Sequence, residues 1–136
     1  MGAWSGLLRL HAQLVPQIDS DLERATGMPL RWYDVLLELN AAQPRRLRML
    51  ELSDAVVLSR TRVSRVVDEL VEAGFVTRIP NPDDRRSAFA ELSLAGRNAF
   101  RKAAPVYLEL IRTQLGKRVT SRDATELRRI LDRALS

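Results

Sequence analysis

Segment 60–68 carries hydrogen-bond donors at a spacing that gathers them on one side of a helix. They stand at positions i, i+1, i+4 and i+5 and are Arg60, Thr61, Ser64 and Arg65, with Asp68 at i+8. Residues three and four positions apart share a helix face, so these side chains would project together. Hydroxyl groups and planar guanidinium groups are suited to contact phosphates and the edges of nucleic-acid bases.

Five apolar residues define the opposite side of the same segment. They repeat as i, i+3, i+4, i+7 and i+8 and are Val63, Val66, Val67, Leu70 and Val71. Ser59 is a natural N-cap and Gly74 a natural residue beyond a helix end, so we expect a helix over Ser59–Ala73. Its N-terminal dipole would favour a phosphate nearby, and Arg62 adds a further donor there. Any soluble helix has a charged outer face, however, and that simpler interpretation of the donors stays open.

A second group of donors lies in the turn PNPDDRRSAFAELS, residues 80–93. The flanking segments FVTRI (75–79) and AFAEL (88–92) alternate with period two and predict a β-hairpin, which places Arg85 and Arg86 at its tip. A hairpin beside a groove-reading helix can insert arginine into a narrow minor groove, where the negative potential is concentrated. We expect Asp84 to pair with Arg86 and hold its guanidinium outward. A plain charged β-turn is the alternative.

The rest of the chain predicts further helices. Apolar residues recur at helical spacing over residues 4–25, 31–40, 49–56, 93–116 and from about 120 onward. A short helix, a tight turn, a capped second helix and a hairpin follow one another in the order of a winged helix-turn-helix. We therefore expect one mainly α-helical domain with a small β-hairpin wing. Residues 30–97 would form the winged-helix lobe, and residues 1–28 and 98–136 a helical dimerisation region.

Dimerisation is expected from the terminal helices. Their apolar stripes are wide, and the central lobe of a 136-residue chain can cover only part of them. An exposed apolar patch of that size would be a liability in a monomer, so we expect a second copy of the chain as a partner. A twofold dimer would present two identical helices to successive major grooves, which predicts a pseudo-palindromic binding site.

Charge supports a polyanionic partner but does so unevenly. The net charge is +5, distributed as −2 over residues 1–42, +2 over residues 43–97 and +5 over residues 98–136. Of the 22 basic residues, 20 are arginine, which suits phosphate and base contacts. A genome rich in arginine codons explains that ratio equally well.

Composition argues against several classes of protein. The chain has no cysteine and one histidine, His11, so we expect no disulfide, no metal site and no thiol-based redox sensor. No nucleophile–base pair or glycine-rich phosphate loop is present, which argues against an enzyme and against a cofactor. No apolar run approaches membrane-spanning length, so a soluble, cytoplasmic protein without membrane contact is expected.

The segment LRMLELSDAVVLSRTRVSRVVDELVEAGFVTRIPNPDDRRSAFAELSLAGR, residues 47–97, resembles the DNA-binding lobe of the MarR family of bacterial transcription regulators. The resemblance extends through the flanking helices over nearly the whole chain. It implies an obligate homodimer whose first and last two helices interlock. It also implies that Ser59–Ala73 is the recognition helix, that Arg86 is the wing arginine of the minor groove and that Asp84 is its partner.

Three positions depart from the family pattern. Arg48 stands where a capping Ser or Thr is frequent, Val57 where Gly is frequent, and Ser93 where Thr is more usual. We expect the first two to weaken or tilt the short helix 49–56 without removing the fold.

The same resemblance implies a small aromatic or anionic effector bound between the dimer helices and the DNA-binding lobe. Candidate contacts are His11, Trp32, Tyr33 and Tyr107, with Trp4 as a weaker candidate. The alternative is that these side chains simply pack the core or the dimer interface.

The sequence therefore predicts a sequence-specific regulator that binds double-stranded DNA, most simply a homodimeric repressor released from its operator by an effector. The expected DNA contacts are Ser59, Arg60, Thr61, Arg62, Ser64, Arg65, Arg85 and Arg86, with Asp84 as wing support. The alternative function is a winged-helix module for protein–protein contact.

Overall fold

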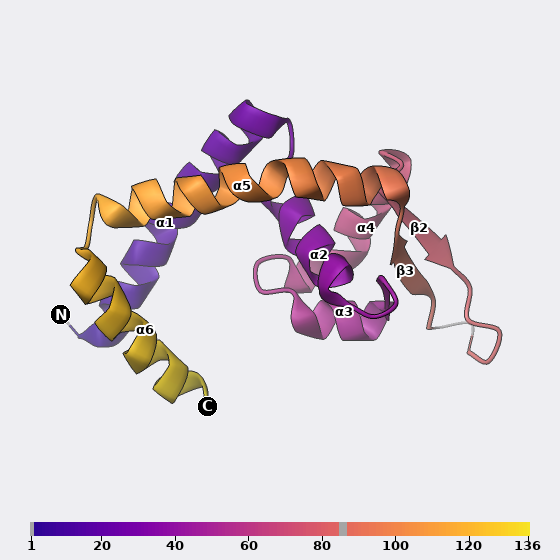
Figure 1. Ribbon diagram of the computed structural model, residues 1–136. Helices are drawn as coiled ribbons and strands as arrows, with labels where there is room; N and C mark the ends of the chain where they lie inside the picture. Colours follow the sequence, from indigo (N-terminus) through magenta and orange to yellow (C-terminus); the bar gives the residue numbers. More distant parts are fainter. Residues whose placement is uncertain (1, 85–86) are drawn as a thin grey trace.

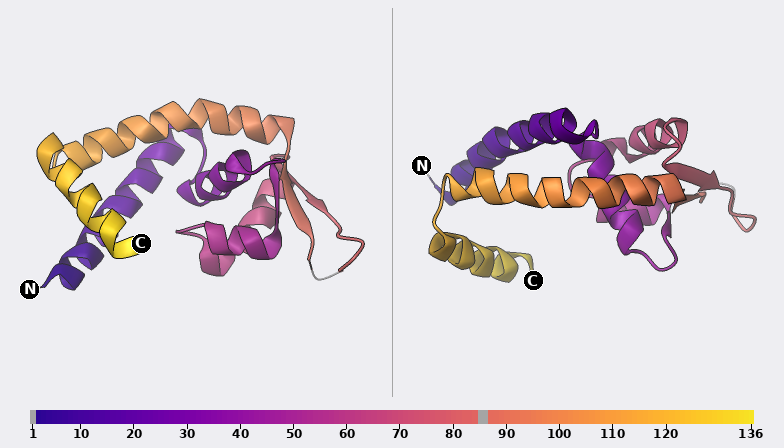
Figure 2. Two further views of the ribbon diagram at one scale, coloured as in Figure 1. Left: turned by 60° about the horizontal axis from the view of Figure 1, so that its bottom comes forward. Right: turned by 45° about the horizontal axis from the view of Figure 1, so that its top comes forward.

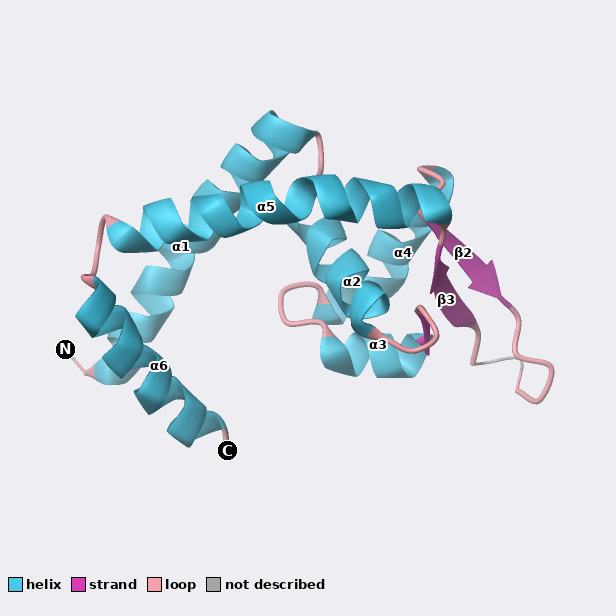
Figure 3. Ribbon diagram, in the orientation of Figure 1, coloured by secondary structure: helices cyan, strands magenta, loops and turns pink. Residues whose placement is uncertain are grey.

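The computed structural model describes residues 2–84 and 87–136, and within them the chain is mainly helical (Figures 1 and 3). The α-helices are α1 (Ala3–Thr26), α2 (Leu30–Ala41), α3 (Met49–Ala55), α4 (Val63–Glu72), α5 (Leu94–Gly116) and α6 (Ser121–Leu135). The strands are β1 (Arg46–Arg48), β2 (Val76–Ile79) and β3 (Phe89–Leu92), and a 3₁₀ turn, η1, spans Arg60–Arg62. Among these residues, no helix is both long and apolar enough to cross a lipid bilayer.

Helix α5 runs along the molecule and connects two regions (Figures 1 and 2). The winged-helix lobe, formed by α2 through β3 (residues 30–92), lies beneath the N-terminal end of α5. Helix α1 crosses α5 and makes its most extensive helix–helix packing there. At the far end lie α6, the first half of α1 (residues 3–14) and the second half of α5 (residues 105–116), which we call the helical arm. The predicted mainly α-helical winged-helix fold is confirmed.

The hydrophobic core lies in the winged-helix lobe and beneath the adjoining ends of α1 and α5. Its fully buried side chains come mostly from α2, α3 and α4 and are Leu22, Val35, Leu36, Leu39, Leu52, Val66, Val67 and Leu70. Each such side chain stabilises the fold by about 1.5–3 kcal/mol relative to exposure. In contrast, α6 contributes no buried residue. The core therefore holds α4 in place and leaves the helical arm largely uncovered.

The sheet has three antiparallel strands in the order β1–β3–β2. Strands β2 and β3 pair from Val76 with Leu92 to Ile79 with Phe89, which confirms the predicted hairpin. Strand β1 was missed, because residues 41–46 read as a loop and a three-residue strand shows no periodicity. Its pairing, Arg46 with Glu91 to Arg48 with Phe89, is made with a segment distant in sequence.

The ends of the helices follow the expected chemistry at several positions. Gly27 and Gly74 adopt φ of 76° and 82° just beyond α1 and α4, a conformation that favours glycine. The Ser93 hydroxyl accepts a hydrogen bond from the Gly96 amide at 3.0 Å and caps α5. Thr120 and Asp123 form a reciprocal capping box at the start of α6, as their spacing predicts.

Arg48 does not cap α3 with its side chain, because a guanidinium cannot accept a hydrogen bond. Instead the Arg48 amide donates to the Glu51 carboxylate at 3.0 Å, which supplies half of a capping box. The short helix thus forms in spite of the expected weakness at this position.

Candidate nucleic-acid interface

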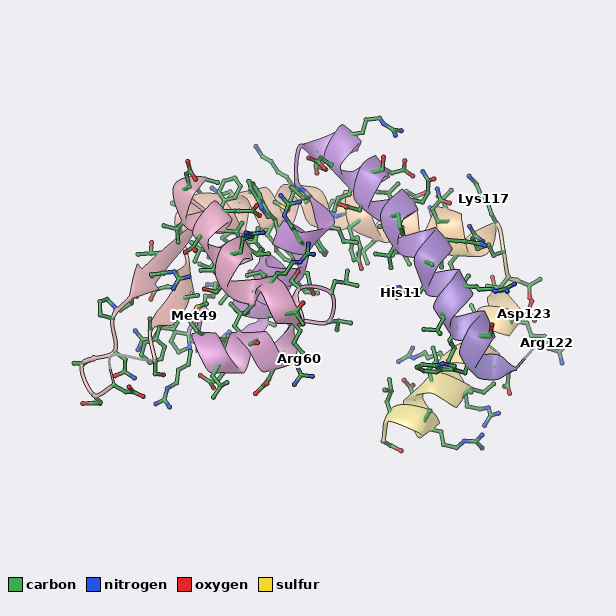
Figure 4. The ribbon with its side chains drawn as sticks, turned by 180° about the vertical axis from the view of Figure 1, so that it is seen from behind. His11, Met49, Arg60, Lys117, Arg122 and Asp123 are labelled. Carbon is green, nitrogen blue, oxygen red and sulfur yellow. The ribbon has the colours of Figure 1, made fainter. Side chains whose placement is uncertain are left out.

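The predicted donor face is exposed at the start of the helix-turn-helix's second helix. Its members Arg60, Thr61, Arg62, Ser64 and Arg65 are all exposed. The Arg60 side chain is 68% exposed, projects away from the lobe in Figure 4, and lies 3.6 Å from the exposed Asp54 carboxylate. A pair this exposed is weak and exchangeable with solvent or a phosphate. The face therefore presents hydroxyl and guanidinium donors free of any packing role.

The predicted start of this helix was wrong. Residues 60–62 form a 3₁₀ turn, and α4 begins at Val63. Ser59 is 4% exposed and caps nothing with its side chain, so it does not belong to the donor face. Its hydroxyl instead lies 3.5 Å from the Arg31 carbonyl oxygen in α2. The residue type is a good cap, but the tertiary contact with α2 takes precedence.

Asp34 holds the turn that precedes the donor face. This buried carboxylate accepts hydrogen bonds from the amides of Leu58 at 3.0 Å and Ser59 at 3.1 Å, and lies 3.5 Å from the Val57 amide. A charged acceptor is stronger than a neutral one, so one side chain of α2 fixes the turn. Sequence analysis missed it, although a lone acidic residue inside the apolar run WYDVLL was a detectable signal.

Arg78 joins the wing to α4. From β2, its guanidinium lies 2.9 Å from the Asp68 carboxylate and donates to the Ser64 carbonyl at 3.2 Å and hydroxyl at 3.3 Å. Because Ser64 accepts from Arg78, its hydroxyl group can still donate its own proton to another acceptor. Arg78 was also missed; a lone arginine in a strand opposite Ser64 and Asp68, spaced i and i+4 on the helix, is its only signature.

Glu69 joins the other side of α4 to α2. Its carboxylate accepts hydrogen bonds from Arg31 Nε at 2.8 Å, Arg31 Nη2 at 3.3 Å and Trp32 Nε1 at 3.0 Å. These bonds hold the pKa of Glu69 below its usual range, with Arg31 as the main cause. Glu69 thus has its partners inside the lobe.

The described part of the wing turn is organised by Asn81. This side chain is buried and its Oδ1 accepts from the Asp83 amide at 3.0 Å, while its carbonyl accepts from the Asp84 amide at 3.2 Å. Asp84 is exposed, and its carbonyl accepts from the Ser87 amide at 3.0 Å. The predicted wing arginines, Arg85 and Arg86, lie outside the described residues.

The four effector candidates do not share one site. His11 and Tyr107 line a hollow of about 630 Å³ between α1, α2 and α5, together with apolar side chains and the carboxyl groups of Asp34 and Glu38. In Figure 4, His11 projects from α1 toward the lobe. Trp32 lines a different hollow, of about 700 Å³, beside Phe75. The first hollow is therefore the candidate effector pocket, and Trp32 does not belong to it.

Tyr33 is packed rather than available. It is 3% exposed, with its ring centroid 4.2 Å from that of Tyr107 and 5.1 Å from that of Phe100. Burial raises the pKa of Tyr33 to about 12 and also raises the pKa of Tyr107. Burial, with the nearby charge of Asp34 second, raises the pKa of Glu38 in the candidate effector pocket. Tyr33 therefore packs in the core, which was the alternative to a contact with an effector.

Comparison with known proteins agrees with this architecture. Residues 26–87 match the family model described as MarR family. Sco3205 of Streptomyces coelicolor, a MarR family transcriptional regulator solved in complex with DNA, is 31% identical with a TM-score of 0.83, over 97% of this chain and 82% of its own. AbsC, a MarR family regulator of the same organism, is 28% identical with a TM-score of 0.81, over 98% and 89%.

A more distant relative is the transcriptional repressor MprA of Escherichia coli K12, which is 26% identical over 113 residues, or 83% of this chain. The chain spans 64% of the length of that protein. With the winged-helix lobe, the exposed donor face of η1 and α4 and these matches together, the chain belongs to the MarR family of transcriptional regulators.

Proposed function

We propose that this chain is a homodimeric transcription regulator that binds double-stranded DNA in a sequence-specific manner and acts as a repressor. The observation that carries the proposal is the exposed donor face, held rigidly beside a wing. Asp34, Arg78 and Glu69 fix the turn, the wing and α2 to α4 by charged hydrogen bonds. These bonds keep the backbone of the donor face in one orientation and so reduce the conformational entropy lost on binding DNA.

In the proposed complex the N-terminal end of α4 enters the major groove. Arg60 and Arg65 read base edges, and Thr61, Arg62 and Ser64 contact bases or neighbouring phosphates. Arg85 and Arg86 follow the wing into the adjacent minor groove, with Asp84 as support. Asp68 and Glu69 are paired within the lobe, so these two carboxylates add little repulsion toward the DNA backbone.

The homodimer is supported by the helical arm. Large apolar side chains are exposed there, and they are Trp4, Leu7, Leu8, Leu108, Ile130 and Leu135. An isolated amphipathic helix of 15 residues is marginal in water, and α6 makes few contacts with other elements of the described chain. A second copy that covers these faces resolves both problems. The twofold dimer then places two α4 helices on a pseudo-palindromic operator.

Release by an effector is supported by Asp34, which lines the candidate effector pocket and also holds the turn before α4. A ligand that competes for this carboxylate loosens the turn and lowers affinity for DNA. Asp34 and Glu38 disfavour an anion in this pocket, whereas the apolar walls and Tyr107 favour an aromatic compound. We therefore propose a small aromatic effector and replace the wider expectation of an aromatic or anionic one.

The test is selection of bound duplexes from a random pool, followed by anisotropy titrations of the full chain over a range of salt. Arg60→Gln and Arg65→Gln should change base preference, with a loss of roughly 1–3 kcal/mol per base contact. Arg86→Ala should weaken binding to every duplex and reduce the slope of log affinity against log salt by about 1. Arg24→Gln, whose side chain is 73% exposed on α1 outside the helical arm, is the matched control.

Equal affinity for every duplex, or no change in all three variants, would contradict the proposal. Retention of a folded dimer with no affinity for any duplex would instead favour the protein–protein interaction module.

A further inference from the structure

A second hollow, at the base of the wing, collects arginine side chains. It has a volume of about 640 Å³ and lies between the α2–β1 loop, the last residues of β3 and the first turn of α5. Its polar lining comes from Gln43, Arg45, Arg46, Glu91, Ser93 and Arg97. We call it the basic hollow. Its residues from the third strand are Glu91 and Leu92, at the opposite end of β3 from the wing tip.

Two of the three arginines that line the basic hollow have no counter-ion within the described part of the chain. Among the described residues, Arg45 and Arg97 form no ion pair, and neither does Arg101, one turn further along α5. The Nε atoms of Arg45 and Arg97 are buried and have no hydrogen-bond partner in that part of the chain. A buried donor without a partner lowers the free energy of unfolding, so these two Nε groups reduce the stability of the lobe.

The arginines also repel one another. The positive charges of Arg101 and Arg45 hold the pKa of Arg97 below its usual value. Glu91 is the only carboxylate in the described lining, and it lies 4.0 Å from Arg46 Nη1, at the far limit of an ion pair. Glu91 therefore offsets Arg46 and leaves Arg45 and Arg97 uncompensated.

The start of α5 adds to the same field. Ser93 and Leu94 line the basic hollow at the N-terminus of this 23-residue helix, and its first turn contains no acidic residue. The helix dipole places partial positive charge at this end. Arg45, Arg97 and the first residues of α5 thus line one open space of about 640 Å³.

We propose that the basic hollow binds the phosphate group of a small phosphorylated molecule. A compact dianion would neutralise Arg45 and Arg97 together and supply acceptors for their free donors, and Arg is suited to bidentate contact with phosphate. A backbone phosphate of bound DNA has the same chemistry. The small molecule is favoured because the basic hollow lies at the far end of β3 from the wing tip.

The test uses isothermal titration calorimetry of the full chain with inorganic phosphate, with chloride at equal ionic strength as reference. Saturable binding is expected, with affinity at least tenfold weaker in Arg97→Gln and Arg45→Gln. Arg112→Gln replaces an exposed arginine on the same helix as Arg97 and should bind phosphate as the wild type does. Equal binding by all four proteins, or none by the wild type, would overturn the proposal.

Thermal unfolding separates a binding role from a structural one. Without phosphate, Arg97→Gln should unfold at the same temperature as the wild type or higher, because a repulsion is removed. With phosphate at ten times the wild-type Kd, the wild-type midpoint should rise by about 2–6 °C and that of Arg97→Gln by less than about a third as much. A lower midpoint of Arg97→Gln without phosphate, and an unchanged response to phosphate, would make Arg97 a structural residue.

DNA as the source of the phosphate is tested separately, with the duplex selected above and versions extended at both ends. If the small-molecule proposal holds, Arg97→Gln leaves the salt slope of DNA binding unchanged at every duplex length. A reduced slope that appears only with longer duplexes, without binding of free phosphate, would assign the basic hollow to flanking DNA and overturn the proposal. Failure of the proposed DNA binding itself would leave the calorimetric result intact.

Discussion

The winged-helix lobe and the helical arm solve the burial of apolar surface in different ways. In the lobe, apolar side chains of α2, α3 and α4 pack against one another and against the adjoining ends of α1 and α5, and polar groups such as Asp34 and Glu69 satisfy their neighbours. In the arm, helices of similar amphipathic pattern leave Trp4, Leu108 and Leu135 largely exposed. The same sequence pattern is thus satisfied within the chain in one region and not in the other.

An amphipathic stripe therefore predicts that a helix face is buried, but not which partner covers it. Helix α4 finds its partner in α2 and α3 of its own chain, whereas α6 has none of comparable extent in the described chain. The stability of the lobe should therefore be independent of protein concentration, and that of the arm should depend on it.

One substitution made in both regions should have opposite effects. A Cβ at Gly96 would collide with the carbonyl group of Phe75, whereas a Cβ at Gly6 in α1 meets no atom within 4 Å. Gly96→Ala should destabilise the protein by about 3 kcal/mol through overpacking. Gly6→Ala should stabilise it by about 0.5–1 kcal/mol, because alanine is the better helix former.

Urea unfolding monitored by circular dichroism measures both glycine variants. A destabilising Gly6→Ala would show that a second copy packs closely against α1 at that point. A neutral Gly96→Ala would mean that α5 is not held against the lobe as tightly as the structure has it.

The arm should be sensitive to charge on its apolar face. Ile130→Glu should raise the dimer dissociation constant at least 100-fold, or by about 2.7 kcal/mol, since a twofold interface carries the change twice. Sedimentation equilibrium provides the measurement. Arg128→Gln, whose side chain is 84% exposed on the same helix, should leave the constant unchanged. Equal dimerisation in both variants would remove α6 from the interface.

The ion pair and hydrogen bonds of Arg78 should contribute more to DNA affinity than to the stability of the fold. Arg78→Gln breaks the link from β2 to Ser64 and Asp68, and it should lower DNA affinity about tenfold (about 1.4 kcal/mol) while changing stability by less than about 1 kcal/mol. Thr77→Ala, exposed on the same strand, is the control. If both variants bind DNA alike in anisotropy titrations, the wing does not need this link.

The smallest effect concerns alkaline pH. The raised pKa of Tyr33, about 12, means that the folded state keeps its proton while an unfolded tyrosine loses it near pH 10. Stability from this residue is therefore complete below pH 10 and declines as the pH rises toward 12. Tyr33→Phe should lose less stability than the wild type between pH 8 and pH 11 in urea unfolding. A parallel decline in both proteins would show that Tyr33 does not contribute.

The sequence was a good guide wherever a pattern is local. Periodicity predicted each α-helix to within a few residues, and the turn residues predicted the hairpin formed by β2 and β3. It failed where two distant segments meet. Strand β1 has only three residues and exists because β3 lies beside it, and Ser59 is buried because α2 approaches it.

In the candidate site too, features within one element were predictable and contacts between elements were not. The donor types at Arg60, Thr61, Ser64 and Arg65 were evident from spacing alone, since one helix determines its own faces. Asp34 and Arg78 were not, because each acts on residues of another element. The sequence also did not show that His11 and Tyr107 line one hollow and Trp32 another, since residue type does not say which side chains share a hollow.

The sequence by itself determined which stretches become helices and strands, which face of α4 is polar and which class of partner its donors suit. These properties depend on backbone preferences and on side chains a few positions apart. It took the folded chain to show that Asp34 holds the turn before α4, that Arg78 joins the wing to it and that Arg45 and Arg97, without an ion pair in the described part of the chain, line one hollow at the base of the wing. Electrostatic interactions depend on distance in space, and for these residues folding alone sets that distance.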